Sequence, residues 1–242
     1  MLVGLTVTAP LVVIDGIPPG LGAPELRWLV VAGAGNVVGL VLAYGALRVG
    51  KVSIVAPITS TEGAIAAVLA VATGEAVGVG SGVLLVVIAV GIALASAAPD
   101  GGSNDQRRAA LLAVSAALCF GAGIYATGRL SETLPLVWAV IPARFVGVVA
   151  IAVPLAATRH LHLTRAALPL VIIAGLCEVG GFASFAAGAR DSIAISAVLA
   201  SQFAALTVLA AYVLFHERIT RLQLAGVAVI AVGVAVLTAL QG

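Results

Sequence analysis

The stretch Asp191–Leu240, DSIAISAVLASQFAALTVLAAYVLFHERITRLQLAGVAVIAVGVAVLTAL, decides the fold class of this chain. It holds two long apolar runs on either side of the charged triplet His216-Glu217-Arg218. The first run, Ser192–Phe215, has 24 residues without a charge, and the second, from Leu222 to the end, has 21. A helix that crosses a hydrocarbon layer needs about 20 apolar residues. Each run therefore predicts one membrane-spanning helix.

The composition of the whole chain leads to the same conclusion. Of the 242 residues 62% are apolar and 9% are charged, with a mean hydropathy of +1.23, whereas a soluble domain has roughly 25% charged residues. We therefore expect an all-α integral membrane protein. A β-barrel is not expected, because the runs are about 20 residues long and lack alternation. The net charge of +2 without a basic tract argues against nucleic acid as a partner, so none is expected.

Seven further apolar runs precede the opening stretch. The shortest, 1–14, is too short to cross a bilayer, and 52–73 is interrupted by Pro57 and Glu62. The sequence thus predicts eight full spans and one partial span. A polar linker at 99–108 separates a first half, 1–98, from a second half, 109–242. The seven runs are 1–14, 28–47, 52–73, 76–98, 109–128, 134–158 and 166–189.

The two halves are similar to each other at an offset of 142 residues. This shift places Glu75 on Glu217, Arg48 on Arg190, and Val87–Gly91 on the identical Val229–Gly233. We interpret the match as an internal duplication with five spans in each copy. An odd number of spans makes the two copies run in opposite directions, which gives an inverted repeat. The offset predicts that the first copy lacks its first helix, because that copy would begin roughly 34 residues before Met1. The excess of Arg and Lys in alternate loops predicts that the C-terminus lies outside the cytoplasm.

Two carboxylates lie near the middle of predicted spans. Glu62 is 11 residues from Lys51, and Glu178 is 12 residues from Arg190. An ionisable group at this depth costs about 2.5–3.5 kcal/mol, so it usually faces a cavity or a partner. Because equivalent positions of an inverted repeat converge at the midplane, we expect one central polar site, with hydrogen bonds that merely join helices as the alternative. Arg144 either pairs with one carboxylate or extends to the interface. The candidate pathway residues are Asn36, Ser60, Glu62, Arg144, Glu178 and Gln202.

Catalytic and metal-binding patterns are missing from the sequence. It has no HExxH, no GxSxG and no paired carboxylates, so we expect neither an enzyme nor a cofactor. His160 and His162 have no third ligand nearby and are expected in a headgroup-level loop. Cys119 and Cys177 fall inside predicted spans and are expected to be small packing residues.

Short motifs resemble the EamA-like branch of the drug/metabolite transporter superfamily. They are Ser201–Leu209, Glu217-Arg218-Ile219-Thr220 with Gln223, and, in the first copy, Ser53–Ile58 with Gly74-Glu75. Arg144 also matches an Arg often found in the second helix of each family repeat. Phe203 and His216 depart from the family pattern, which usually has Pro and Gly there. The resemblance implies a ten-helix carrier of the bacterial inner membrane built from two five-helix repeats.

The expected function is therefore alternating-access transport of a small solute such as an amino acid, an amine or a drug, commonly outward. The solute and the lipid bilayer are the expected partners. Two mid-membrane carboxylates favour a cationic or amine-bearing solute, unless a Glu is protonated. Proton coupling through either Glu is a further hypothesis. The alternative is a non-transporting membrane scaffold or a truncated remnant of a carrier, which the missing first helix favours.

Overall fold

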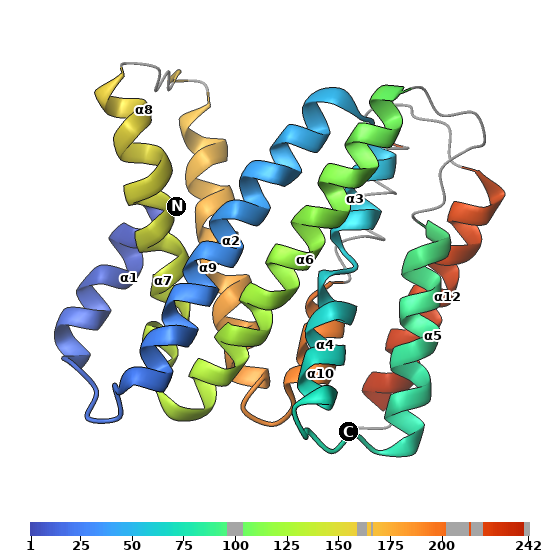
Figure 1. Cartoon of the computed structure of the whole chain (residues 1–242), viewed down its shortest axis with the longest axis horizontal. Helices are drawn as coiled ribbons and strands as arrows, with labels where there is room; N and C mark the ends of the chain where they lie inside the picture. The colour runs from blue at the N-terminus through green and yellow to red at the C-terminus, as the bar shows by residue number, and fades with distance from the viewer. Residues whose placement is uncertain (96–103, 159–163, 166, 202–212, 214–219, 240–242) are drawn as a thin grey trace. The chain divides into compact units, whose positions relative to one another are not determined.

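The computed structural model describes residues 1–95, 104–158, 164–165, 167–201, 213 and 220–239. These ranges contain helices and no strand, which confirms the predicted all-α class. Figure 1 labels the elements in chain order. They are α1 (Leu2–Asp15), α2 (Ala23–Val49), α3 (Val52–Thr59), α4 (Glu62–Ala72), α5 (Val79–Ala95), α6 (Asn104–Thr133), α7 (Leu136–Gly147), the π-helical turn η1 (Val148–Ala152), α8 (Val153–Ala157), α9 (Leu168–Gly188), α10 (Ile193–Ala200) and α12 (Arg221–Ala239).

Four of the described helices are long and apolar enough to cross a membrane. They are α2, α6, the continuous run Leu136–Ala157 and α9. The π-helical turn inside Leu136–Ala157 lies just before Pro154, whose missing N–H removes one helical hydrogen bond. Helices α1, α4 and α5 contain shorter apolar segments. These helices do not establish how many times the chain crosses the membrane, so the eight full spans and one partial span stay a prediction.

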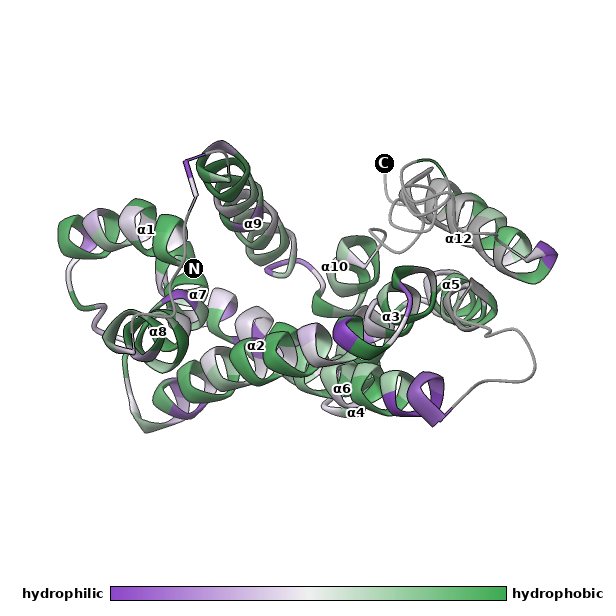
Figure 2. Cartoon of the chain, turned by 90° about the horizontal axis from the view of Figure 1, so that it is seen from above, coloured by the Kyte–Doolittle hydropathy of each residue, from purple (hydrophilic) through white to green (hydrophobic). Residues whose placement is uncertain are grey.

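Apolar side chains cover the outside of the helices as well as their contacts. On α9 the consecutive residues Leu170, Val171, Ile172 and Ile173 are all exposed. Figure 2 shows hydrophobic colour along most of each helix and hydrophilic colour gathered at helix ends, as at the start of α6. Exposed apolar surface on this scale is unfavourable in water and favourable in hydrocarbon. The helices are therefore suited to a lipid environment.

Two helix boundaries bear directly on the predicted runs. The run 52–73 is divided into α3 and α4 at Ser60-Thr61, near the predicted interruption. Helix α6 begins at Asn104, so the second half of the expected linker 99–108 is helical instead. The acidic Asp105 in the first turn of α6 is favourable beside the positive end of the helix dipole.

The chain forms two compact units. The first consists of Met1–Val37 and Gly123–Asp191. In it α1, α7 and α9 pack against one another (Figure 1). Its core is rich in alanine, and the rings of Trp28 and Tyr125 meet edge to face at 5.5 Å. Small side chains let helix backbones approach closely, which is how helices associate in lipid.

The second unit consists of Val38–Ala122 and Ser192–Gly242. Here α5 packs along α12, and α4 packs along α10 (Figure 1). Each unit takes segments from both expected repeats, so packing units and sequence repeats are different divisions of the chain. The division into repeats 1–98 and 109–242 stays a prediction.

Candidate functional site

Arg144 lies on α7 in the first unit, with no exposed surface. Its Nη1 atom is 3.5 Å from Oε1 of Glu178 on α9, and Nη2 donates a hydrogen bond of 3.4 Å to the Glu178 carbonyl oxygen. The guanidinium carbon is 4.4 Å from the ring centre of Phe182. Phe182 lies one helical turn after Glu178, so both side chains project from the same face of α9. Arg144 thus pairs with a carboxylate in the structure and does not extend to the membrane interface.

The surroundings of this ion pair explain how a charge is held inside the unit. Nε and Nη1 of Arg144 have no hydrogen-bond partner in the described part of the chain. The carboxylate and the aromatic face therefore provide the main compensation for burying the charge. Gly4 of α1 lies against the stem of the arginine, where a Cβ would be only 3.1 Å from Cγ. The ammonium group of Met1 lies 3.6 Å from Oε2 of Glu178.

Asn36 also belongs to the first unit, on α2. It is buried, and its Oδ1 atom has no hydrogen-bond partner among residues 1–95, 104–158 and the other described segments. Gly123 of α6 lies beside it, where a Cβ would be 3.2 Å from the backbone nitrogen of Asn36. A buried amide oxygen without a partner costs about 1–3 kcal/mol. Asn36 is therefore a buried acceptor that no described residue of the first unit hydrogen-bonds.

Ser60 and Glu62 lie in the second unit, at the break between α3 and α4. Helix α3 ends at Thr59 and α4 begins at Glu62. Ser60 is fully buried, and its Oγ donates a hydrogen bond of 2.8 Å to the Ala56 carbonyl oxygen. Thr61 does the same toward Ile58, also at 2.8 Å. Hydroxyl groups that bond to preceding carbonyls often bend helices, and two such bonds lie here next to the break.

A second helix end meets this break. Helix α10 ends at Ala200 with Ser201 as its C-cap, and the offset of 142 maps α3 onto 194–201, within one residue of α10. Gly63 of α4 packs directly on this end. A Cβ on Gly63 would lie 2.3 Å from the Ala197 carbonyl oxygen and 2.6 Å from Ser201 Oγ. Only glycine allows α4 and α10 to cross this closely.

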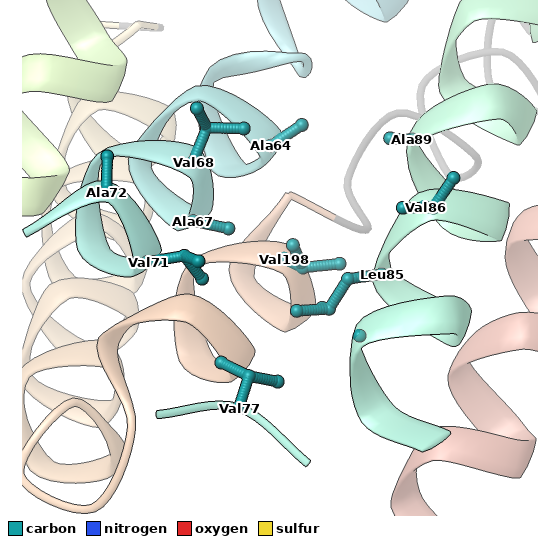
Figure 3. A pocket seen from close by; sticks show the side chains of 11 residues that line it. Ala64, Ala67, Val68, Val71, Ala72, Val77, Leu85, Val86, Ala89 and Val198 are labelled. Atoms are coloured by element: carbon teal, nitrogen blue, oxygen red, sulfur yellow. The ribbon is translucent and has the colours of Figure 1, made fainter. Parts of the chain in front are cut away.

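An apolar cavity of about 490 Å³ lies beside this crossing in the second unit (Figure 3). In the close view Val198 of α10 and Leu85 of α5 lie near each other, and Val68 and Val71 of α4 form another part of the lining. The cavity-lining positions on α4 fall roughly opposite Glu62 around the helix. The cavity is therefore separate from the polar groups at the break. Its full lining is Ala64, Ala67, Val68, Val71, Ala72, Val77, Gly82, Leu85, Val86, Ala89 and Val198.

The structure thus groups four of the six predicted residues into two pairs. Arg144 lies with Glu178 in the first unit, and Ser60 lies with Glu62 in the second. Asn36 is in the first unit, and Gln202 lies outside the described residues. Convergence of all six on one central site stays a prediction.

Sequence reasoning did not assign a role to three residues that make specific contacts in the structure. The only sequence signal for Phe182 was its position four residues after Glu178, on the same helix face. The only signal for Gly63 was its position directly after the interruption at Glu62. Glu75 aligned the two halves, yet it was not assigned a structural role. Among the described residues no group of three His, Cys, Asp or Glu side chains could hold a metal ion. His160 and His162 lie outside those residues.

Comparison with known proteins identifies the class to which this architecture belongs. The helices, their apolar surfaces and the family match define a multi-pass membrane protein. Residues 107–239, more than half of the chain, match the model of the EamA-like transporter family, and the chain belongs to this family. Family members are membrane transporters of small solutes rather than enzymes.

Solved structures with a similar fold include one titled "Crystal structure of protein". The alignment covers 98% of the present chain and 85% of the chain in that structure, with a TM-score of 0.71. At 18% identity this likeness shows the fold alone. No curated protein matches the chain.

Proposed function

We propose that the chain exports a small amine-bearing or amphipathic solute across the bacterial inner membrane by alternating access. One observation carries the proposal. In the second unit the break between α3 and α4 packs against the end of α10, at positions that correspond under the offset of 142. Interrupted helices are a feature of solute sites in transporters, and here the interrupted helix of the first copy meets the end of α10.

The break supplies polar groups where uninterrupted helices would have none. The first N–H groups of α4 have no carbonyl partner one turn earlier within that helix. Ser60 and Glu62 add a hydroxyl and a carboxylate at the same point. Non-helical backbone at membrane depth is tolerated where protein buries it or a water-filled cavity surrounds it. The break is therefore a suitable place for the polar part of a solute.

The two carboxylates have different roles in this proposal. Glu178 faces the charge of Arg144, so much of its own charge is balanced inside the protein. Glu62 forms no ion pair with any residue in the described ranges. We therefore assign recognition of an ammonium group to Glu62, while Glu178 stabilises Arg144. Asn36, Arg144 and Gln202 remain proposed members of the pathway.

Transport in proteoliposomes tests this assignment. An overexpressing strain grown against a panel of amino acids and toxic amines would first identify the solute by the resistance it confers. We expect Glu62→Gln to reduce uptake of the amine at least tenfold, because an ammonium group would lose its charged partner. The matched control is Glu132→Gln, an exposed carboxylate that pairs with Arg129 on the same helix. A wild-type rate in Glu62→Gln would reject the assignment of Glu62, and wild-type rates in both Glu62→Gln and Glu178→Gln would reject the central site.

The same vesicles test coupling and the alternative function. Proton coupling through Glu62 or Glu178 predicts that an imposed pH gradient accelerates transport, and rates independent of the gradient would exclude it. A scaffold or a remnant predicts that no solute on the panel crosses the bilayer faster than in empty vesicles. Labelling intact cells and spheroplasts would test the placement in the inner membrane.

A further inference from the structure

Glu75 follows α4 and is aimed by the turn that ends this helix. Gly74 has φ +104°, a left-handed conformation that favours glycine. The N–H of Glu75 donates a hydrogen bond of 3.0 Å to the Ala70 carbonyl oxygen, as in a Schellman-type helix end. This turn fixes the backbone of Glu75 beside the C-terminal end of α4.

The Glu75 side chain caps a different helix, more than 100 residues later in the chain. Oε1 accepts hydrogen bonds from Ser192 Oγ at 2.5 Å and from the Ala194 N–H at 3.2 Å. Oε2 lies 3.3 Å from the same Ala194 nitrogen, and Ser192 Oγ accepts from the Ile195 N–H at 3.1 Å. A carboxylate at the first turn of a helix satisfies free N–H groups and interacts favourably with the helix dipole.

Helices α4 and α10 are consequently joined at both ends. Gly63, at the start of α4, packs on Ser201, at the end of α10. Glu75, just after α4, holds Ser192, just before α10. The two helices are therefore antiparallel, with a steric contact at one end and a charge-assisted polar contact at the other. The steric contact at Gly63 sets how closely the two helices approach. The polar contact at Glu75 can be broken by moving the helix ends apart, which causes no steric clash.

We propose that Glu75 is a latch that holds the N-terminal end of α10 against α4 and releases it when this end of the helix pair separates during transport. The inference rests on the proposed alternating-access function. It adds a positioning residue that acts through α10 rather than by touching the solute. The latch lies at the membrane side that contains the loop 73–78.

A buried thiol beside the latch tests the proposal. Ala194 has no exposed surface, so Ala194→Cys, made with Cys119 and Cys177 replaced by Ser, reports separation of α10 from α4. We expect Glu75→Gln to accelerate labelling by a membrane-impermeant maleimide about tenfold, which corresponds to about 1.4 kcal/mol. The gain should occur only with reagent added on the side of loop 73–78. A helix that is merely loosened would gain reactivity from both sides.

The matched control is Asp191→Asn, which removes an exposed carboxylate next to α10 that forms no hydrogen bond or ion pair with the described residues. It should leave the rate within about twofold of the parent. Equal rates in Glu75→Gln and the parent, or an equal gain from both sides, would overturn the latch.

A second measurement needs no cysteine reporter. Hydrogen exchange of the Ala194 and Ile195 amides should quicken about tenfold in Glu75→Gln and remain unchanged in Asp191→Asn. Unchanged exchange of both amides in Glu75→Gln would also contradict the proposal. Neither measurement requires a solute. If the protein transports solute but Glu75→Gln does not accelerate labelling or exchange, only the latch proposal fails. If labelling and exchange accelerate but no solute is transported, only the transport proposal fails.

Discussion

Replacing Gly63 by alanine tests whether the crossing of α4 and α10 is as close as the structure shows. The new Cβ would lie 2.3 Å from the Ala197 carbonyl oxygen and 2.6 Å from Ser201 Oγ. An ordinary carbon–oxygen contact is about 1 Å longer, so the two helices must separate. Overpacking of this kind costs typically about 1–3 kcal/mol, and the limited freedom of a backbone oxygen places Gly63→Ala at the upper end.

A gain in helix propensity opposes this cost. Alanine is more favourable than glycine inside a helix by up to about 1 kcal/mol. The net loss for Gly63→Ala is therefore about 2 kcal/mol. For a protein of this size that corresponds to a midpoint of thermal unfolding lower by about 4–8 °C. The assay is thermal unfolding of the purified protein in detergent.

Gly180→Ala is the matched control, because this glycine is inside α9 and a Cβ there would meet no atom of the other described segments within 4 Å. This variant should gain only the higher helix propensity of alanine, so its midpoint of thermal unfolding should equal or exceed that of the parent. Adding Ser201→Gly to Gly63→Ala should recover part of the lost stability, since Ser201 supplies two of the three close atoms. The reasoning fails if Gly63→Ala and Gly180→Ala are equally stable.

Two further predictions concern the ion pair of the first unit. Glu178→Gln should lower the unfolding free energy by about 2 kcal/mol, below the 3–5 kcal/mol typical of a fully buried pair, because this carboxylate is partly exposed. Adding Arg144→Met should restore most of that loss in a double-mutant cycle, and strictly additive losses would show that the two groups do not interact. Phe182→Leu should lower the unfolding free energy by about 1 kcal/mol, because it removes the aromatic face from the guanidinium. The control Phe145→Leu, at an exposed position on α7, should cost much less. Equal losses in the two variants would count against the cation–π contact.

The sequence alone determined the class of the protein and most of its helical segments. Hydropathy is a local property, so runs such as 134–158 and 166–189 could be located without knowing what surrounds them. The interruption of 52–73 was also predictable, because Pro57 removes a backbone donor and Glu62 is costly in an apolar run. Family membership follows from the match over 107–239.

Helix ends were predicted less well where polar residues are compatible with a helix. Asn104–Arg108 was expected in the linker, yet it forms the first turn of α6. Polar composition favours a loop only statistically, whereas an acidic first turn also stabilises a helix start. Local sequence therefore could not decide between the two structures.

The tertiary structure alone decided which side chains meet. Arg144 could pair or extend to the interface, and only the packing of α7 on α9 brings it to Glu178 and Phe182. Glu75 marked the duplication in the sequence, but its contact with Ser192 joins residues 117 positions apart. Spacing along one helix predicts which residues share a face, but it carries no information about which helix will cover that face. That choice depends on close packing in three dimensions, as at Gly63, where a single missing Cβ allows two helix ends to meet.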